Sequence, residues 1–156
     1  MPDMLVKLYD LDIEEDYLEK LEDEGIIIKR ALPPEKYKVV EWIESEFSRG
    51  WASECEAAFS RQPVSCFIAI RDDSIVGFAC YNATYKDFFG PEGVSESCQG
   101  KGIGKALLLR SLAAMKDEGY AYAIIGAAGP TGFYQKVCNA EIIKNSSPGI
   151  YKNMLS

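Results

Sequence analysis

The chain has 156 residues, of which 47% are hydrophobic and 26% are charged, and its formal net charge is −7. This length and composition predict one globular domain with a sizeable core and exclude a disordered chain. The acidic excess argues against binding to nucleic acid or to an anionic membrane surface, and it is compatible with a cationic substrate.

Cysteine and histidine usage narrows the chemistry further. The chain contains no histidine, so a Ser-His-Asp triad, a Cys-His pair and a zinc site lack their usual participants, and we expect no metal. A general base must therefore be a carboxylate, a tyrosine, a lysine or a water relay. The cysteines are irregularly spaced without a Cys-x-x-Cys pair, which predicts reduced thiols in a cytoplasmic protein. They are Cys55, Cys66, Cys80, Cys98 and Cys138.

The first 25 residues predict a short extension made of a strand and a helix. Residues 4–11 alternate in the manner of a strand, and residues 12–21 have a cap at Asp12, an acidic first turn and a stop at Gly25. No basic region precedes an apolar core here, and no apolar run is long enough to span a bilayer, so we expect neither a signal peptide nor a membrane partner. We expect residues 1–25 to lie outside the core of a domain formed by residues 26–156.

The remaining segments predict a mixed α/β domain with short connections. Runs of β-branched residues indicate strands, and apolar residues at helical spacing, such as Val40, Ile43 and Phe47, indicate helices. We expect strands at 26–31, 66–71, 75–81, 88–94 and 120–126, helices at 35–47, 51–59, 104–118 and 131–137, and a terminal hairpin of 141–145 with 150–154.

Residues 88–94 predict a distorted strand. Gly90, Pro91 and Gly93 fit poorly into a hydrogen-bonded ladder, so this strand should lie at an edge or contain a bulge. Either arrangement leaves backbone groups unpaired immediately before the stretch that carries most of the chemistry.

That stretch is Gln99-Gly100-Lys101-Gly102-Ile103-Gly104-Lys105, which leads into an apolar helix. Its alternate glycines let a ligand approach the main chain, because no Cβ atoms stand in the way. The free N–H groups and the positive dipole end of the first helical turn favour an anion, and the two lysines add charge. The stretch therefore predicts a site for a phosphate-bearing ligand.

Two well-known phosphate loops do not fit this spacing. A Walker loop requires a first glycine where Gln99 stands and a hydroxyl residue where Ala106 stands. A dinucleotide loop of the form Gly-x-Gly-x-x-Gly begins at Gly100 and Gly102 but meets Lys105 in place of its last glycine.

The pattern that fits is Gln/Arg-x-x-Gly-x-Gly/Ala, given by Gln99, Gly102 and Gly104. With Val94 five residues upstream and Phe133-Tyr134-x-Lys136 after the next strand, the chain from residue 26 onward resembles the GNAT superfamily of N-acetyltransferases. The resemblance implies a single domain with a mixed central sheet, splayed at the cofactor site, and helices on both faces.

The resemblance also implies acetyl-CoA as co-substrate and assigns its binding groups. Val94 and Ser95 would offer backbone groups to pantetheine, the main chain from Gln99 to Lys105 would bind the pyrophosphate, and Phe133 would pack along the cofactor arm. The family often has an asparagine where this chain has Ala127, so the turn there would use backbone or water instead.

The reaction implied is direct attack of a neutral amine on the thioester. Tyr134 occupies the family position of the acid that protonates the departing thiolate, and its ordinary pKa of about 10 keeps it protonated at neutral pH. The base is left open between Glu92, which shares the side-chain parity of Val94, and Glu54, near Trp51.

The leading hypothesis is an N-acetyltransferase that acts on a primary amine of a small molecule or peptide. A non-catalytic acyl-CoA-binding sensor or regulatory module is the alternative, and a nucleotide-binding protein with an unrelated glycine loop is a third. The acceptor stays unidentified, and its pocket is expected to involve Phe47, Trp51, Glu54 and Tyr81. The oligomeric state, with a homodimer as one option, is left open.

Overall fold

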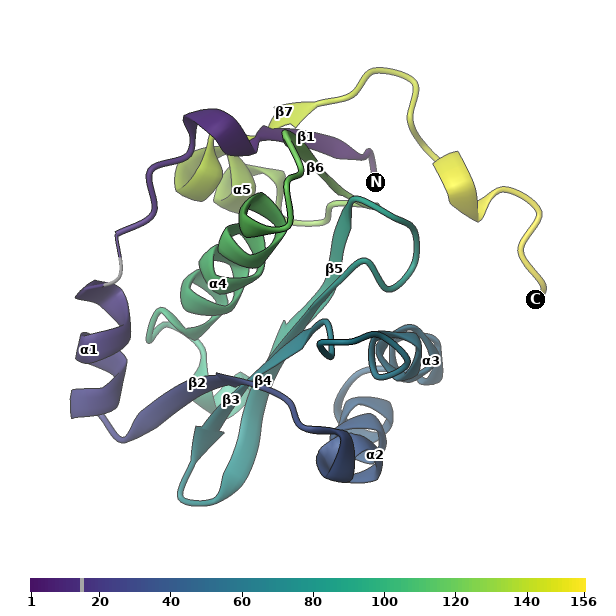
Figure 1. The fold of residues 1–156 in the computed structure, drawn as a ribbon. Coiled ribbons are helices and arrows are strands. Elements are labelled where there is room, and N and C mark those ends of the chain that lie inside the picture. The colour runs from purple at the N-terminus through teal and green to yellow at the C-terminus, as the bar shows by residue number, and fades with distance from the viewer. Residues whose placement is uncertain (15) are drawn as a thin grey trace.

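The computed structural model describes residues 1–14 and 16–156 as helices packed on a single mixed sheet (Figure 1). The strands are β1 (Met4–Lys7), β2 (Ile26–Arg30), β3 (Cys66–Arg71), β4 (Ser74–Tyr81), β5 (Phe88–Val94), β6 (Tyr122–Ile125) and β7 (Glu141–Ile142). The α-helices are α1 (Asp16–Asp23), α2 (Lys36–Glu46), α3 (Arg49–Ala58), α4 (Ile103–Asp117) and α5 (Thr131–Cys138). Short 3-10 turns are η1 (Leu8–Asp10), η2 (Pro33–Glu35), η3 (Glu96–Cys98) and η4 (Gly149–Tyr151). These bounds confirm the predicted mixed α/β domain and, to within a few residues, its elements from residue 26 to residue 138.

The sheet order is β2-β3-β4-β5-β6-β1-β7, and every neighbouring pair is antiparallel except β5 with β6. That parallel pair is short, because only Phe88 and Phe89 of β5 face β6. The β4–β5 ladder also shifts its register between Ala79 and Tyr81, opposite the glycine and proline of β5. The predicted distortion of residues 88–94 is confirmed, and its result is that β5 and β6 separate beyond Phe89.

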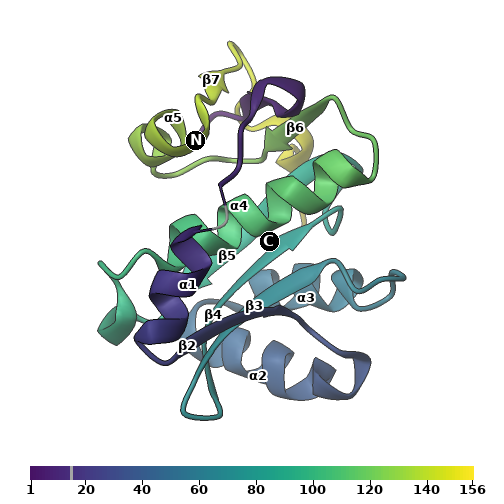
Figure 2. The same ribbon diagram turned by 60° about the vertical axis from the view of Figure 1, so that its left-hand side comes forward.

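The two faces of the sheet carry separate groups of helices, as the views in Figures 1 and 2 agree. Helices α2 and α3 cover one face and share a core with β3 and β4, whereas α1, α4 and α5 lie on the other. Helix α4 is the most deeply buried, with Leu107, Leu108 and Leu112 fully inaccessible to solvent. Its position fixes the glycine-rich stretch at the end of β5.

The expectation that the N-terminal segment lies outside the core is wrong. Strand β1 pairs with β6 along its whole length, and Met4, Val6 and Leu8 are completely buried. Without β1, the exposed edge of β6 would leave a row of backbone groups unpaired. The helix expected at 12–21 is observed over Asp16–Asp23, and residue 15 lies outside the described residues. A domain boundary at residue 26 stays a prediction.

The expected terminal hairpin is also wrong. Strand β7 pairs with β1 instead, and residues 149–151 form the turn η4. The reason lies in Ser146, whose hydroxyl accepts a hydrogen bond from the Asp3 N–H at 2.8 Å and donates one to the Ile143 carbonyl at 2.6 Å. These bonds tie the segment after β7 to the N-terminus, so the last residues run on as a separate arm (Figure 1).

Candidate active site

A cleft of about 1410 Å³ opens where β5 and β6 separate. It is bounded by β5, the first turn of α4, the turn after β6, helices α3 and α5, and the C-terminal arm. Most of its lining side chains are hydrophobic. Among the described residues, the charged side chains that reach it are those of Glu54, Glu92 and Lys105.

The glycine-rich stretch forms one end of this cleft, at the start of α4. Gly100 and Gly102 have φ angles of 81° and 85°, in the left-handed region that favours glycine. Gly102 caps the helix without any side-chain hydrogen bond, and the first bond of the helix runs from the Ala106 N–H to the Gly102 carbonyl at 3.0 Å. The N–H groups before Ala106 therefore have no acceptor within the helix. This end has the properties of an anion site.

The predicted loop residues do not all reach the cleft. Those that line it are Gln99, Gly100, Gly102, Ile103, Gly104 and Lys105. Lys101 is exposed beside the cleft and is not part of its wall. Ser95 also lies outside the wall, because its N–H donates to the Val76 carbonyl at 2.8 Å and its carbonyl accepts from the Cys98 N–H at 2.9 Å. The structure therefore does not bring Ser95 to the place where the resemblance expects it.

Part of the β5 backbone faces the gap and not a neighbouring strand. The Ser95 N–H donates to the Val76 carbonyl, and hydrogen-bonded residues alternate along an antiparallel strand. The next residue of β5 whose N–H and carbonyl face β4 is therefore Gly93, which lies opposite Phe78. By the alternation of a strand, the backbone groups of Glu92 and Val94 point away from β4. β6 does not pair with this part of β5. An extended ligand could therefore pair with these groups as a strand would, although the Gln99 amide already approaches the Val94 carbonyl at 3.5 Å.

Glu92 projects from β5 toward α4. A Cβ atom on Gly104 would lie 3.1 Å from Glu92 Oε1, so the absence of a side chain at Gly104 makes room for this carboxyl group. Glu92 Oε2 is buried and has no hydrogen-bond partner among the described residues. Burial raises the pKa of Glu92 well above its usual range, since the charged form loses hydration without gaining a partner.

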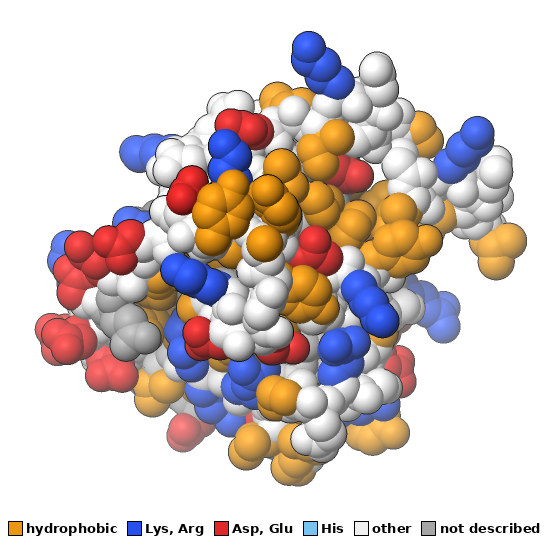
Figure 3. All heavy atoms as spheres, turned by 45° about the horizontal axis from the view of Figure 1, so that its top comes forward, with side chains coloured by type: hydrophobic (Ala, Val, Ile, Leu, Met, Phe, Trp, Pro, Cys, Tyr) orange, Lys and Arg blue, Asp and Glu red, His pale blue; other side chains and the backbone are white. Residues whose placement is uncertain are grey.

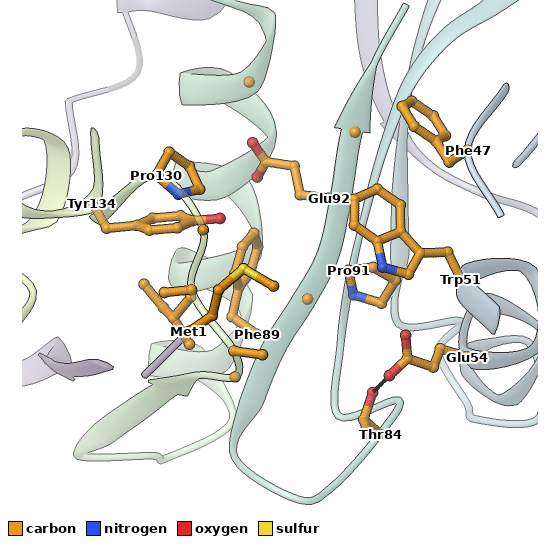
Figure 4. Close-up of a pocket in the computed structure, with 18 of the residues that line it drawn as sticks. Met1, Phe47, Trp51, Glu54, Thr84, Phe89, Pro91, Glu92, Pro130 and Tyr134 are labelled. Carbon is orange, nitrogen blue, oxygen red and sulfur yellow. Dashed lines mark hydrogen bonds between the residues drawn. The ribbon is translucent and has the colours of Figure 1, made fainter. Parts of the chain in front are cut away.

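Tyr134 faces Glu92 across the gap. It lies in α5, is 8% exposed, and packs edge-on against Phe89 and Phe133, with ring centroids 6.4 and 5.3 Å away. Figure 4 shows the Tyr134 hydroxyl and the Glu92 carboxyl pointing toward one another. Burial, followed by the nearby charge of Glu92, raises the pKa of Tyr134, which keeps the hydroxyl protonated. Phe133 also lines the cleft, as expected.

A second carboxylate, that of Glu54, lies on the other side of β5 (Figure 4). Its Oε1 atom accepts hydrogen bonds from Thr84 Oγ1 at 2.7 Å and from the Tyr151 hydroxyl at 3.2 Å. Phe47 and Trp51 line the cleft beside it, as the sequence predicted. Thr84 and Tyr151 were missed, because no local pattern connects them with a residue on α3.

The expectation for Tyr81 is wrong. Its side chain is 1% exposed and does not line the cleft, because its hydroxyl accepts a hydrogen bond from Arg30 Nη1 at 2.6 Å. Ala127 does line the cleft, and its N–H donates to Asp3 Oδ1 at 2.8 Å. The turn that carries Ala127, at the position where asparagine was expected from the resemblance, is thus held by the N-terminal segment.

Three of the scattered cysteines meet behind α3. The sulfur atoms of Cys55, Cys66 and Cys80 lie within 4.8 Å of one another, and all three residues are fully buried. Hydrogen bonds with the other two thiols lower the pKa of Cys55 to about 5. This group of thiols could hold a soft metal ion, but it lies in the apolar core and not in the wall of the cleft.

The splayed mixed sheet, with an anion site at a helix start and a backbone edge facing the gap, defines a GNAT fold. A sequence model of the acetyltransferase (GNAT) family matches residues 35–139. The chain belongs to this family.

Solved structures share the fold at low identity. The chain is similar to the glucosamine N-acetyltransferase region of a fungal multi-domain GH3 β-N-acetylglucosaminidase, with a TM-score of 0.74 and 15% identity over 91% of this chain and 19% of that one. It is similar to a GCN5-related N-acetyltransferase from Sphaerobacter thermophilus, with a TM-score of 0.66 and 18% identity over 91% of this chain and 48% of that one. A GNAT acetyltransferase from Brucella melitensis, solved in complex with acetyl-CoA, has a TM-score of 0.58 and 18% identity over 71% of this chain and 80% of that one.

The chain spans less than half the length of the first two of these structures. No curated protein sequence matched it. In its described part, the chain has no helix of the length and hydrophobicity needed to cross a bilayer.

Proposed function

We propose that this protein is an acetyl-CoA-dependent N-acetyltransferase that transfers an acetyl group directly to a primary amine of a small molecule or peptide. The observation that carries the proposal is the convergence of Tyr134 and Glu92 on the gap between β5 and β6 (Figure 4). An acid and a base are the two groups that amine acetylation requires.

The shape and chemistry of the cleft fit acetyl-CoA. The unpaired N–H groups at the start of α4 and the Lys105 ammonium suit a pyrophosphate, which is doubly anionic. The backbone groups of Glu92 and Val94 suit the amide-containing pantetheine arm. We assign binding to Val94, Phe133 and the loop residues that line the cleft, with Lys101 adding charge from outside the wall.

Acetyl-CoA supplies the thioester, and the residues of the chain move the protons. An ammonium acceptor loses one proton to solvent and a second as the new amide bond forms, while the sulfur gains one. Glu92 is placed to take the proton from nitrogen, since a raised pKa brings a carboxylate closer to the basicity useful at neutral pH. Tyr134 is placed to give the proton to sulfur. Because the two groups face one another, transfer from Glu92 to Tyr134 resets both.

Replacing Tyr134 with phenylalanine tests the acid role. Loss of a general acid costs about 10²- to 10⁴-fold in rate, so Tyr134→Phe should lower kcat by that order while the acetyl-CoA Kd stays within about twofold. Tyr122→Phe is the matched control, since Tyr122 is exposed on β6 and lies outside the cleft. A large loss of affinity with normal turnover in saturating acetyl-CoA would contradict the assignment.

Calorimetric titration with acetyl-CoA, CoA, ATP and NAD tests the ligand itself. We expect binding of the two coenzyme A forms and none of NAD or ATP. Binding of acetyl-CoA without transfer to any amine would favour the acyl-CoA sensor, and binding of ATP or NAD alone would favour the nucleotide-binding protein.

A further inference from the structure

The half of the cleft around Glu54 indicates what kind of amine the protein accepts. We infer that the acceptor is a cationic amine with an aromatic or bulky apolar body and without an acidic group, held by Glu54 and by the aromatic wall beside it. This inference rests on the proposed acetyltransferase activity and narrows its substrate class.

The wall of this half is aromatic and built as a unit. Phe47 packs on Trp51 with ring centroids 5.3 Å apart, and both rings contact the buried Phe78, at 5.8 and 6.0 Å. Gly93 of β5 lies against the Phe47 ring, since a Cβ atom on Gly93 would fall 2.5 Å from Phe47 Cζ. The side chains are therefore fixed by the core behind them. A rigid aromatic surface of this kind binds flat or apolar groups.

The C-terminal arm adds more apolar groups to the cleft. Ile150, Tyr151 and Met154 line the cleft together with Tyr85 of the β4–β5 connection. Figure 3 shows hydrophobic side chains gathered beside this arm, with acidic side chains between them. A contiguous exposed apolar surface in a cleft is typical of a binding site for an apolar ligand.

Charge in the cleft is unbalanced in a way that favours a cation. Glu54 forms no salt bridge within the described residues, and Lys105, the one cationic side chain among the described residues of the wall, belongs to the anion site on α4. The amino group of Met1, which also lines the cleft, donates to the Ser147 hydroxyl at 3.5 Å.

Glu54 is oriented to receive a ligand. Thr84 and Tyr151 both donate to its Oε1 atom, so the carboxylate is held in place by two elements remote from α3. The charge of Glu54 contributes, after burial, to raising the pKa of Tyr151 to about 12, which keeps that hydroxyl a donor. Both donors that hold Glu54 are neutral hydroxyl groups, so its carboxylate has no cationic partner among the described residues and is open to the ammonium group of a ligand. A carboxylate on the acceptor would meet like charge here, and the repulsion would disfavour its binding.

Pairs of amines that share one body test this inference. Tryptamine with tryptophan, and tyramine with tyrosine, differ only by the carboxylate, and their acetylated products can be measured by mass spectrometry. We expect kcat/KM for the arylalkylamines to exceed that for the amino acids by about 100-fold or more, the equivalent of about 2.7 kcal/mol. Equal values, or a preference for the amino acids, would overturn the inference.

Glu54→Gln tests the residue. We expect it to raise KM for tryptamine by about tenfold with little change in kcat, and to shrink the tryptamine-to-tryptophan ratio, because the repulsion of the carboxylate is gone. Glu56→Gln on the same helix is the control, since Glu56 is exposed, pairs with Lys36 at 3.2 Å and lies outside the cleft. A purely structural role for Glu54 would lower activity toward both substrates together and leave their ratio unchanged, which would contradict the assignment.

The same panel separates this inference from the proposed function. Spermidine, an aminoglycoside and a peptide with a free N-terminus represent polar acceptors. Acetylation of these but not of the arylalkylamines would refute the apolar acceptor and leave the acetyltransferase intact. Acetylation of no amine, with acetyl-CoA bound, would refute both.

Discussion

Glu92 joins stability to function in a way that one substitution can reveal. Its carboxyl group lies against the first turn of α4, Oε2 is buried without a hydrogen-bond partner among residues 1–14 and 16–156, and burial raises its pKa well above the ordinary value of 4.5. A charge in this position costs free energy in the folded state only. Glu92→Gln keeps the shape of the side chain and removes the charge, so it should stabilise the protein while abolishing the proposed base.

The size and sign of the effect follow from proton linkage. Below pH 4.5 the carboxyl is protonated in both the folded and the unfolded chain, and it contributes no pH dependence. Above that pH the folded state retains a proton that the unfolded state has lost, so the free energy of unfolding falls as pH rises, by up to about 1.4 kcal/mol per pH unit. The fall stops once pH exceeds the raised pKa of the folded state. The advantage of Glu92→Gln should therefore be smallest near pH 4 and grow toward neutral pH.

Urea unfolding of the ligand-free protein, measured from pH 4 to pH 8, checks this expectation. Other titrating groups cancel in the difference between wild type and variant. Glu96→Gln serves as control, because Glu96 is an exposed carboxylate on η3. If the difference between Glu92→Gln and wild type does not grow from pH 4 to pH 8, the Glu92 carboxyl is hydrated, and the argument for its raised basicity fails.

Three further predictions concern the surroundings of the site. Gly93→Ala should lower the free energy of unfolding by about 1–3 kcal/mol, because the new Cβ atom would lie 2.5 Å from the Phe47 ring. Adding Phe47→Leu to the same chain should recover much of this loss. Urea unfolding curves that show no recovery would refute the clash. Tyr81→Phe should lower the free energy of unfolding by about 1.5–3 kcal/mol, because the hydrogen bond from Arg30 is lost. It should leave kcat unchanged, because Tyr81 lies outside the cleft, and a reduced kcat would contradict this placement. All five thiols should resist iodoacetamide in the native protein and react in urea, since all are buried and free; fewer than five labelled thiols in urea would indicate a disulfide.

Local features of the fold were predictable because they depend on backbone geometry within a few residues. Gly90, Pro91 and Gly93 cannot complete a regular ladder, and the register shift and separation of β5 appear there. The glycines before α4 likewise predicted a helix start open to an anion, and Gly100 and Gly102 adopt the left-handed conformation that glycine allows. Phe133 and Tyr134 line the cleft because they lie on the short helix α5, which follows β6.

The tertiary structure decided what depends on pairings between distant segments. An alternating stretch such as residues 4–7 predicts a strand without naming its partner, and only the unpaired edge of β6 fixes β1 inside the core. The strand pattern around Tyr81 did not show whether its side chain faces the cleft, and the hydrogen bond from Arg30 holds it in the core. Glu54 acquired its orientation from Thr84 and Tyr151, which are 30 and 97 residues away along the chain. The sequence by itself determined the start of α4 and the broken strand before it, since both follow from local dihedral preferences. The aromatic wall and Glu54 beside it could not be predicted from local sequence, because these residues meet only when the sheet and the C-terminal arm are in place.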